Sequence, residues 1–262
     1  MMRALWTAAT GMAAQTTNVD VISNNLANVN TAGFKRGRAN FQDLMYQQVK
    51  TPGSEASGAG TQLPSGIQIG LGVQTSSVTS IFSAGSLKQS DNPLDLAIKG
   101  RGFFEVLNAN GDLAYTRGGS FSTDSQGQLV TANGDLVQPG ITIPSDALSI
   151  SIAEDGTVSV EQQGSQSSIV GQLTTVDFSN PGGLKLLGGS LYAPTVASGN
   201  AIAGTPGLNG FGYIGQGMLE MSNVNIVEEM VNLIAGQRAY EMNSKAIQAA
   251  DEMLQAANSV KR

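Results

Sequence analysis

Two apolar stripes at opposite ends of the chain constrain its fold more than any other feature. Near the N-terminus, apolar residues recur at alternating three- and four-residue spacing, as on one face of a coiled-coil helix. They are Leu5, Ala8, Met12, Val19, Ile22, Leu26 and Val29, with Gln15 as the single polar interruption. Near the C-terminus, steps of seven residues connect Ile226, Leu233, Tyr240, Ile247 and Leu254. The sequence therefore predicts a long amphipathic helix at each end, about 35 residues or roughly 50 Å at the C-terminus.

The two predicted helices can cover one another, but a two-helix pair leaves apolar surface exposed. The second column of the C-terminal helix reads Met230, Gln237, Ser244 and Asp251, and most of it is polar. Such a helix suits a crowded assembly better than a simple two-stranded coil. We therefore predict self-assembly through Leu5, Met12, Val19, Ile22, Leu26, Val29, Ile226, Met230, Leu233, Tyr240, Ile247 and Leu254. An intramolecular coiled coil packed on the middle of the chain is the alternative.

The middle of the chain, residues 74–221, predicts an all-β domain. Residues 103–107 form a predicted strand, and Asn110-Gly111-Asp112 is a turn that leads into a second strand at 113–116. Further short strands are expected at 141–143, 148–152, 158–160 and 173–178. The predicted fold class is α+β, with long coiled-coil-forming helices, 1–30 and 222–262, bracketing the β domain.

Residues 31–73 connect the first helix to this domain. The first helix is expected to end near Asn28 or Asn30. Residues 39–49 show weak helical periodicity, so that a short helix and an extended arm are both open. Apolar residues at 67, 69, 71 and 73 alternate strictly, which predicts a strand with one buried face. At the other end, Ser222 or Asn223 is the expected cap of the last helix.

Composition excludes several kinds of catalysis. The chain has no histidine and no cysteine, so it cannot build a Ser-His-Asp triad, a cysteine nucleophile or a zinc site of those ligands. The formal charge of −6 disfavours a nucleic-acid partner. We interpret the short basic cluster of Lys35, Arg36 and Arg38 as a solvated or interface patch. We interpret the glycine-rich segment 204–217 as tight strand returns and not as a phosphate cradle.

The beginning of the chain, up to Trp6, superficially resembles a signal peptide. Thr7, Thr10 and Gln15 interrupt the apolar stretch, and cleavage would destroy the apolar stripe. We therefore interpret the segment as mature structure. No run in the sequence is long and apolar enough to span a bilayer.

Three sets of motifs resemble one known family. Residues 23–35, SNNLANVNTAGFK, look like the signature of the bacterial flagellar rod and hook proteins. The matching motif residues are Asn24, Asn25, Leu26, Asn28, Gly33 and Phe34. Residues 222–231, SNVNIVEEMV, and 237–245, QRAYEMNSK, are similar to the C-terminal block of that family. LPSGIQIG at 63–70, AIKGRGFF at 97–104 and TPGLNG at 205–210 resemble its distal-rod branch.

This resemblance implies a non-enzymatic subunit that polymerises helically into the distal rod of the flagellar basal body, transmits motor torque and encloses the export channel. It implies that the terminal helices form an inner tube, that the β domain lies outside, and that residues 46–68 are a rod-type insertion. The implied partners are other copies of the chain, proximal rod and hook proteins, surrounding periplasmic and outer-membrane ring proteins, and the flagellar type III export apparatus. No cofactor, nucleic acid or small-molecule substrate is implied.

The resemblance also implies a location in the rod that crosses the periplasm and export without a cleaved signal peptide. A proximal-rod or hook subunit is the nearest alternative, although a hook protein usually carries an additional outer domain. A cell-wall carbohydrate-processing enzyme is the remote alternative. It would use paired carboxylates, Asp91 with Asp95 or Glu154 with Asp155, for which no supporting motif is present.

Overall fold

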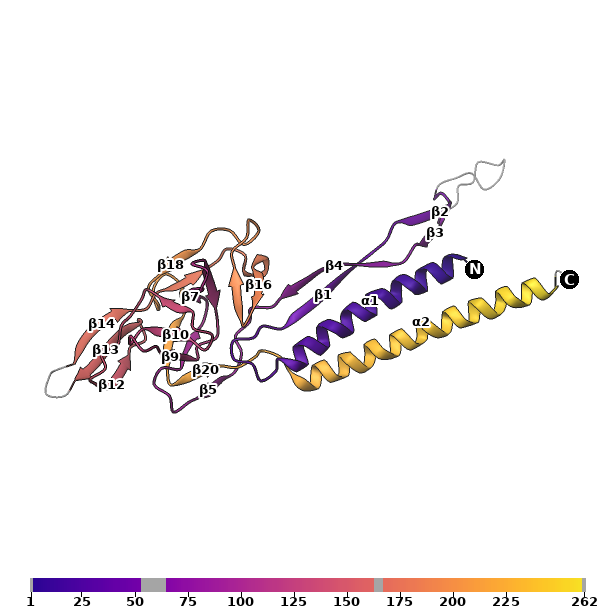
Figure 1. The fold of residues 1–262 in the computed structure, drawn as a ribbon. Coiled ribbons are helices and arrows are strands. Elements are labelled where there is room, and N and C mark those ends of the chain that lie inside the picture. The colour runs from indigo at the N-terminus through magenta and orange to yellow at the C-terminus, as the bar shows by residue number, and fades with distance from the viewer. Residues whose placement is uncertain (1, 53–64, 163–166, 261–262) are drawn as a thin grey trace. The chain divides into compact units, whose positions relative to one another are not determined.

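The computed structural model describes residues 2–52, 65–162 and 167–260 (Figure 1). The chain divides into two compact units. The first, which we call the helical unit, contains Met1–Leu26, Gly37–Thr79 and Ile226–Arg262. The second, which we call the β unit, contains Ala27–Arg36 and Ser80–Asn225. Residues 53–64, which form much of the predicted rod-type insertion, lie outside the described residues.

Both predicted terminal helices are present in the helical unit, as α1 (Met2–Ala27) and α2 (Ile226–Val260). They run antiparallel (Figure 1), because Asn25 near the end of α1 contacts Glu229 near the start of α2. Helix α2 is 35 residues long, as expected. The predicted cap was wrong, because α2 begins three residues after Asn223. Neither described helix combines the length and the hydrophobicity that a membrane crossing needs.

An extended ribbon completes the helical unit and settles the alternatives left open for residues 39–49. Strand β1 (Gly37–Asp43) pairs with β4 (Val73–Ser80), and β2 (Tyr46–Lys50) pairs with β3 (Ile67–Gly70). The ribbon contacts α1 where the backbone N–H of Val73 donates to Thr10 Oγ1 at 3.4 Å. The buried face predicted for Ile67 and Ile69 was wrong, since these side chains are 48% and 40% exposed in the single chain.

The β unit consists of short antiparallel strands. Its largest sheet has nine strands in the order β16 (Lys185–Gly188), β17 (Leu191–Ala193), β8 (Leu113–Thr116), β7 (Phe103–Leu107), β11 (Leu136–Gln138), β10 (Leu129–Thr131) and β9 (Phe121–Thr123), with β15 (Thr175–Asp177) on β7 and β18 (Ile202–Gly204) on β15. A second sheet contains β12 (Ala147–Ile152), β13 (Thr157–Gln162) and β14 (Ser168–Gln172). The β unit also contains two separate strand pairs: β6 (Leu96–Lys99) with β19 (Tyr213–Gln216), and β5 (Leu87–Gln89) with β20 (Met218–Glu220). A short 3-10 helix spans Pro181–Gly183. The predicted α+β class, with terminal helices around a β-rich middle, is confirmed.

Strand β7 contributes side chains to two separate hydrophobic clusters of the β unit. Neighbouring residues of a strand point to opposite faces, so Phe103 and Phe104 enter different clusters. Phe104 joins the main aliphatic core of the sheets. Phe103 joins an aromatic cluster and packs edge-to-face on Phe178 and Tyr192, with ring centroids 5.7 and 5.9 Å apart. One strand therefore ties both cores together.

The segment predicted as a strand at 141–143 is not a regular one. It makes an isolated bridge between Thr142 and Gln128, and the backbone N–H of Ile143 donates to Gly127. Ile141 and Ile143 are nevertheless buried in the main core. The alternation of apolar residues therefore predicted which side chains are buried, but the predicted regular strand is absent at 141–143.

Candidate assembly surfaces and the buried ionic junction

The predicted assembly residues of α1 face the interior of the helical unit only in part. Ile22 is buried, with 5% of its surface exposed. Leu5, Met12, Val19 and Leu26 are each half-buried. Val29 follows the helix, in the β unit, and is also half-buried. The single chain therefore covers this stripe incompletely.

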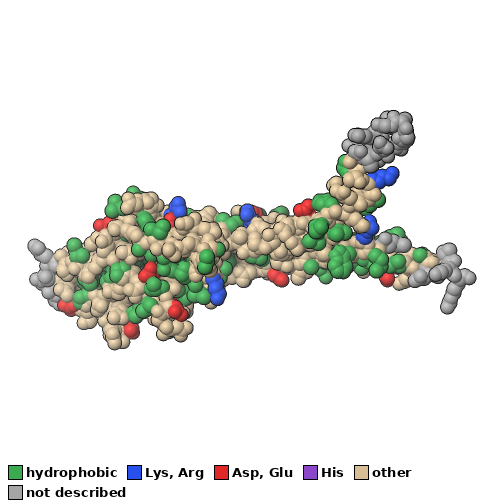
Figure 2. Space-filling model, turned by 90° about the horizontal axis from the view of Figure 1, so that it is seen from above, with side chains coloured by type: hydrophobic (Ala, Val, Ile, Leu, Met, Phe, Trp, Pro, Cys, Tyr) green, Lys and Arg blue, Asp and Glu red, His purple; other side chains and the backbone are tan. Residues whose placement is uncertain are grey.

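The predicted stripe of α2 is covered even less. Leu233, Ile247 and Leu254 are half-buried, whereas Ile226, Met230 and Tyr240 are 47%, 50% and 45% exposed. A second apolar stripe, Val227, Val231 and Ile234, is 70%, 60% and 54% exposed. Its spacing of four and three residues was visible in the sequence, but our count in sevens missed it. Figure 2 shows hydrophobic side chains on the surface of this unit.

Glycines set the contact between the two helices. A Cβ atom at Gly11 would lie 2.9 Å from Asn243 Nδ2, and one at Gly236 would lie 3.3 Å from a methyl group of Val19. Each glycine therefore makes room for a side chain of the opposite helix. Beside this contact a groove of about 410 Å³ remains. Its lining includes Gln15, Thr16, Val19, Gln237, Tyr240 and Glu241.

Asn25, one of the motif residues, holds three elements of the helical unit together. Its Oδ1 accepts from the backbone N–H of Gly37 at 2.8 Å, and its Nδ2 donates to the Gly37 carbonyl at 2.9 Å. The side chain thus pairs with the start of β1 as a neighbouring strand would. Nδ2 also donates to Glu229 Oε2 on α2 at 3.3 Å. Asn25 is 2% exposed, so we assign it to positioning within the unit.

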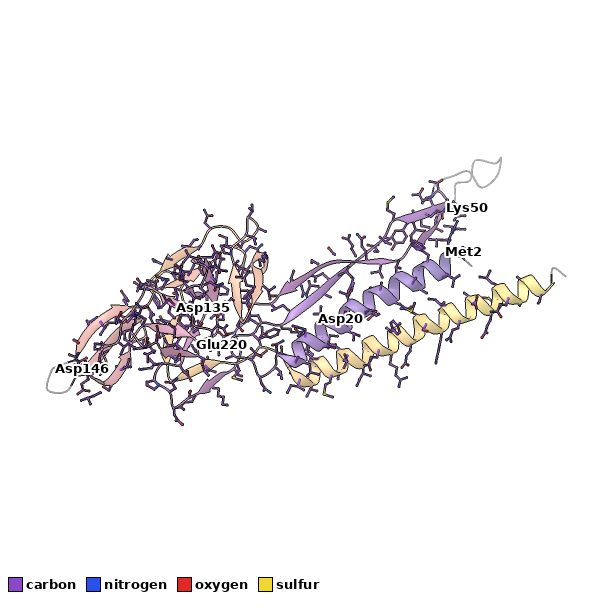
Figure 3. All side chains as sticks on the ribbon, viewed as in Figure 1. Met2, Asp20, Lys50, Asp135, Asp146 and Glu220 are labelled. Atoms are coloured by element: carbon purple, nitrogen blue, oxygen red, sulfur yellow. The ribbon has the colours of Figure 1, made fainter. Side chains whose placement is uncertain are left out.

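The hairpin of β2 and β3 presents a second exposed apolar surface. Five side chains on or beside it are 40% to 82% exposed: Met45, Tyr46, Val49, Ile67 and Ile69. Figure 3 labels Lys50 at the end of β2 and Asp20 on α1. Exposed apolar residues that recur on neighbouring elements mark interaction surfaces more often than scattered ones do.

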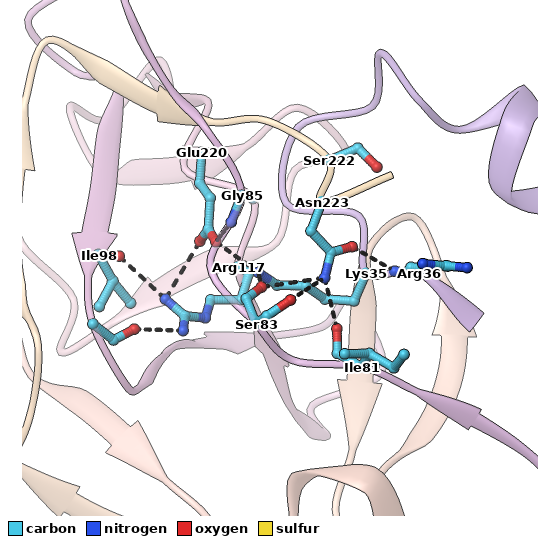
Figure 4. A network of polar contacts seen from close by, with 12 residues as sticks. Lys35, Arg36, Ile81, Ser83, Gly85, Ile98, Arg117, Glu220, Ser222 and Asn223 are labelled. Carbon is cyan, nitrogen blue, oxygen red and sulfur yellow. Dashed lines mark hydrogen bonds and ion pairs between the residues drawn. The ribbon is translucent and has the colours of Figure 1, made fainter. Parts of the chain in front are cut away.

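The β unit contains a buried ionic junction of Lys35, Arg117 and Glu220 (Figure 4). Lys35 Nζ lies 2.6 Å from Glu220 Oε1, and Arg117 Nη1 lies 3.3 Å from Glu220 Oε2. The three side chains are 0%, 4% and 1% exposed. Lys35 also donates to the Ser83 carbonyl at 2.8 Å, and the backbone N–H of Gly85 donates to Glu220 at 3.0 Å. The junction joins the segment after the N-terminal motif to the last strand of the unit.

The burial of this junction shifts the pKa of its cations. Burial lowers the pKa of Lys35, although the hydrogen bond and the charge of Glu220 oppose that shift. Burial likewise lowers the pKa of Arg117, whose guanidinium donates to the carbonyls of Ile98 and Gly100 at 3.2 and 2.6 Å. Our interpretation of Lys35 as part of a solvated or interface patch was therefore wrong.

Asn223, the residue we expected to cap α2, instead joins two backbone segments of the β unit. Its Oδ1 accepts from the backbone N–H of Arg36 at 2.7 Å. Its Nδ2 donates to the carbonyls of Ile81 and Ser83 at 2.8 and 3.2 Å (Figure 4). The oxygen that would accept from a helix N–H is therefore used by Arg36 instead.

The remaining motif residues shape the turn that brings Lys35 to the junction. Asn28 Oδ1 accepts from Thr31 Oγ1 at 3.2 Å, and the backbone N–H of Phe34 donates to the Thr31 carbonyl at 3.3 Å. Gly33 has φ +72°, and a Cβ atom there would lie 2.4 Å from the Gly118 nitrogen. Its own N–H donates to the Glu220 carbonyl at 2.8 Å. The motif thus fixes a turn that only glycine can make at position 33. Asn24 is exposed.

One carboxylate of each pair in the enzyme alternative stabilises a turn, and the other, Asp91 or Glu154, is exposed. Asp95 is buried and accepts from Ser90 Oγ at 2.5 Å and from Asn92 Nδ2 at 3.1 Å. Asp155 accepts from the backbone N–H of Thr157, which lowers the pKa of its carboxyl group. Within the part of the chain that the structure describes, no group of three or more acidic side chains is arranged to hold a metal ion.

Comparison with known proteins agrees with this architecture at both ends and in the middle. Residues 5–35 match the family model described as flagella basal body rod protein. Residues 97–160 match the flagellar hook protein FlgE/F/G D1 domain, and residues 216–260 match the flagellar basal body rod FlgEFG protein C-terminal region. The flagellar basal-body rod protein FlgG of Caulobacter vibrioides is 52% identical over 99% of this chain and 100% of its own length. The proteins of that name in Borreliella burgdorferi and Bacillus subtilis are 49% and 40% identical over the full length of both chains.

Two long terminal helices with incompletely covered apolar faces, on either side of a β-rich middle, fit a subunit that assembles through its ends. The chain belongs to the flagellar basal-body rod protein family. Within that family it is a structural subunit of the distal rod and not an enzyme.

Proposed function

We propose that this rod subunit polymerises through the helical unit, with α1 and α2 of successive copies forming a tube around the export channel. In this proposal residues 1–30 and 222–262 form the inner tube, residues 31–73 form the arm and rod-type insertion, and residues 74–221 form an outer layer. The main support for this proposal is that α2 exposes apolar side chains, among them Val227, Val231 and Ile234, in the single chain. Coiled-coil contacts would then form between copies, where neighbours cover what the single chain leaves exposed.

The stripe of Val227, Val231 and Ile234 shows why several neighbours are needed. Burying a fully exposed side chain contributes about 1.5 to 3 kcal/mol. The three side chains are 70%, 60% and 54% exposed, so covering what remains exposed contributes roughly 3 to 6 kcal/mol in total. Association costs about 4 to 15 kcal/mol in lost translational and rotational freedom. One such contact is therefore too weak to hold two copies together by itself. A helical polymer, in which each copy meets several neighbours, sums these contacts and becomes stiff enough to transmit torque.

The proposed partners follow from this placement. The ends of the polymer would join proximal rod and hook proteins, and its outer layer would face the surrounding periplasmic and outer-membrane rings. We further propose that the subunit passes through the flagellar type III export apparatus and assembles as a rod that crosses the periplasm, with no cleaved signal peptide. In support of this, Ala8 and Ala14 in the N-terminal half of α1 are buried, so that half is part of the packed unit.

The proposal is tested by replacing an exposed apolar residue of α2 with a charged one. Val231→Asp alters a side chain that is 60% exposed in the single chain, so folding should be unaffected. We expect it to abolish polymer formed by the purified full-length chain in sedimentation, and to abolish rods in cells that express only the variant. Val196→Asp is the matched control, because Val196 is fully exposed on the β unit, at 104%. Polymerisation of the Val231→Asp variant at the normal concentration would contradict the proposal.

A further inference from the structure

The methionines of this chain are distributed unevenly between the two units. Of nine methionines, five have at least half of their surface exposed: Met2, Met45, Met230, Met242 and Met253. All five belong to the helical unit, at 76%, 82%, 50%, 65% and 53% exposure. The two methionines of the β unit, Met218 and Met221, are half-buried. The sulfur atoms that an aqueous reagent can reach are therefore concentrated in the unit that we propose polymerises.

These exposed thioethers lie among other exposed apolar side chains. Met230 occupies the same turns of α2 as Val227, Val231 and Ile234. Met45 directly precedes β2 at the base of the exposed hairpin. Methionine is flexible and polarisable, and it fits surfaces that must adapt to irregular neighbours. It is also the side chain through which this chain is most easily oxidised, since there is no cysteine to react first.

We propose that Met45, Met230, Met242 and Met253 form an oxidation-sensitive set that determines whether a free subunit can polymerise. The reagent class is a two-electron oxidant such as hydrogen peroxide. The thioether sulfur gains one oxygen atom and loses two electrons, the peroxide O–O bond breaks, and the peroxide is reduced to water. The sulfoxide is polar and chiral, so it disrupts an apolar contact without cutting the chain. This inference rests on the proposed function, because oxidation matters only if these surfaces become buried between copies.

The experiment treats the purified full-length subunit with graded hydrogen peroxide, maps sulfoxides by peptide mass spectrometry and measures polymer by sedimentation. We expect the exposed set to oxidise well before Met218 and Met221. We also expect the concentration needed for polymerisation to rise by about tenfold or more for each sulfoxide that would be buried. Enzymatic reduction of the sulfoxides should restore polymerisation. In the finished polymer the same methionines should be protected from peroxide.

A variant that carries Met45→Leu, Met230→Leu, Met242→Leu and Met253→Leu together separates this chemistry from general damage. Leucine preserves the volume and cannot be oxidised to a sulfoxide, so the variant should polymerise after peroxide treatment that stops the wild-type chain. Equal polymerisation of oxidised and untreated wild-type subunits would overturn the inference and leave the proposed function intact. So would equal loss of polymerisation in the leucine variant. Failure of the untreated wild-type chain to polymerise would count against both.

Discussion

Removing the one anion of the ionic junction should destabilise the β unit severely. Glu220→Gln keeps the shape of the side chain but leaves Lys35 and Arg117, which are 0% and 4% exposed, as two buried cations without the carboxylate that pairs with both. Removing one partner of a buried ion pair costs about 3 to 5 kcal/mol. For a unit of this size, each kcal/mol lowers Tm by about 2 to 4 °C, so we expect a decrease of roughly 10 °C.

Calorimetry of the full-length chain measures this decrease, and hydrogen exchange should show the loss of protection first around Lys35 and Glu220. Arg101→Gln is the control, because the ion pair of Arg101 with Asp177 is 69% and 21% exposed and should contribute less than about 1 kcal/mol. Lys35→Met should cost less than Glu220→Gln, since it leaves Arg117 paired with Glu220 and no net charge. A loss below about 1 kcal/mol for Glu220→Gln would refute the reasoning.

Three further perturbations test other parts of the structure. Gly33→Ala should destabilise the β unit by several kcal/mol in denaturant titration, since its Cβ would lie 2.4 Å from a backbone nitrogen. The control is Gly134→Ala, which is also at positive φ but has open space around it and should cost only about 1 kcal/mol. Burial raises the pKa of Tyr192 to about 12, above its unfolded value of 10.0. The linked stability, roughly 3 kcal/mol, is therefore fully present below pH 10 and is lost as pH rises toward 12. Tyr192→Phe should flatten this alkaline loss, and an unchanged pH profile would contradict the assignment. Asn25→Ala should reduce the local stability at the start of β1 by about 2 kcal/mol in the polymer, because two hydrogen bonds to Gly37 are lost. Faster hydrogen exchange at the start of β1 would show this loss, and unchanged exchange there would contradict the positioning role of Asn25.

The elements that follow from local periodicity could be predicted from the sequence. The apolar spacing of α1 and α2 gave their positions within a few residues, and the strand at 103–107 matches β7. Residues 39–49 could not be decided, because short apolar patterns fit a helix and a strand equally well. In the folded chain, β1 is extended because it pairs with β4 and because Asn25 bonds to the backbone of Gly37 at its start.

Contacts between distant residues could not be predicted in the same way. Lys35 sits in a basic sequence that is typical of a solvated face, and its counter-ion is 185 positions away. Lysine is almost never fully buried without a partner, so nothing local indicated its burial. Asn223 looked like a helix cap because of its place before α2, whereas its amide is used by backbone segments near residues 36 and 81. The stripe of Val227, Val231 and Ile234 differs, since its spacing was present in the sequence.

A density map of the native rod, at a resolution that shows side chains, tests the central claim most directly. The account predicts that Val227, Val231 and Ile234 of α2 contact neighbouring copies, and that the hairpin of β2 and β3 is covered as well. A map in which both terminal helices touch only their own chain, with these side chains still facing solvent or the channel, would contradict it.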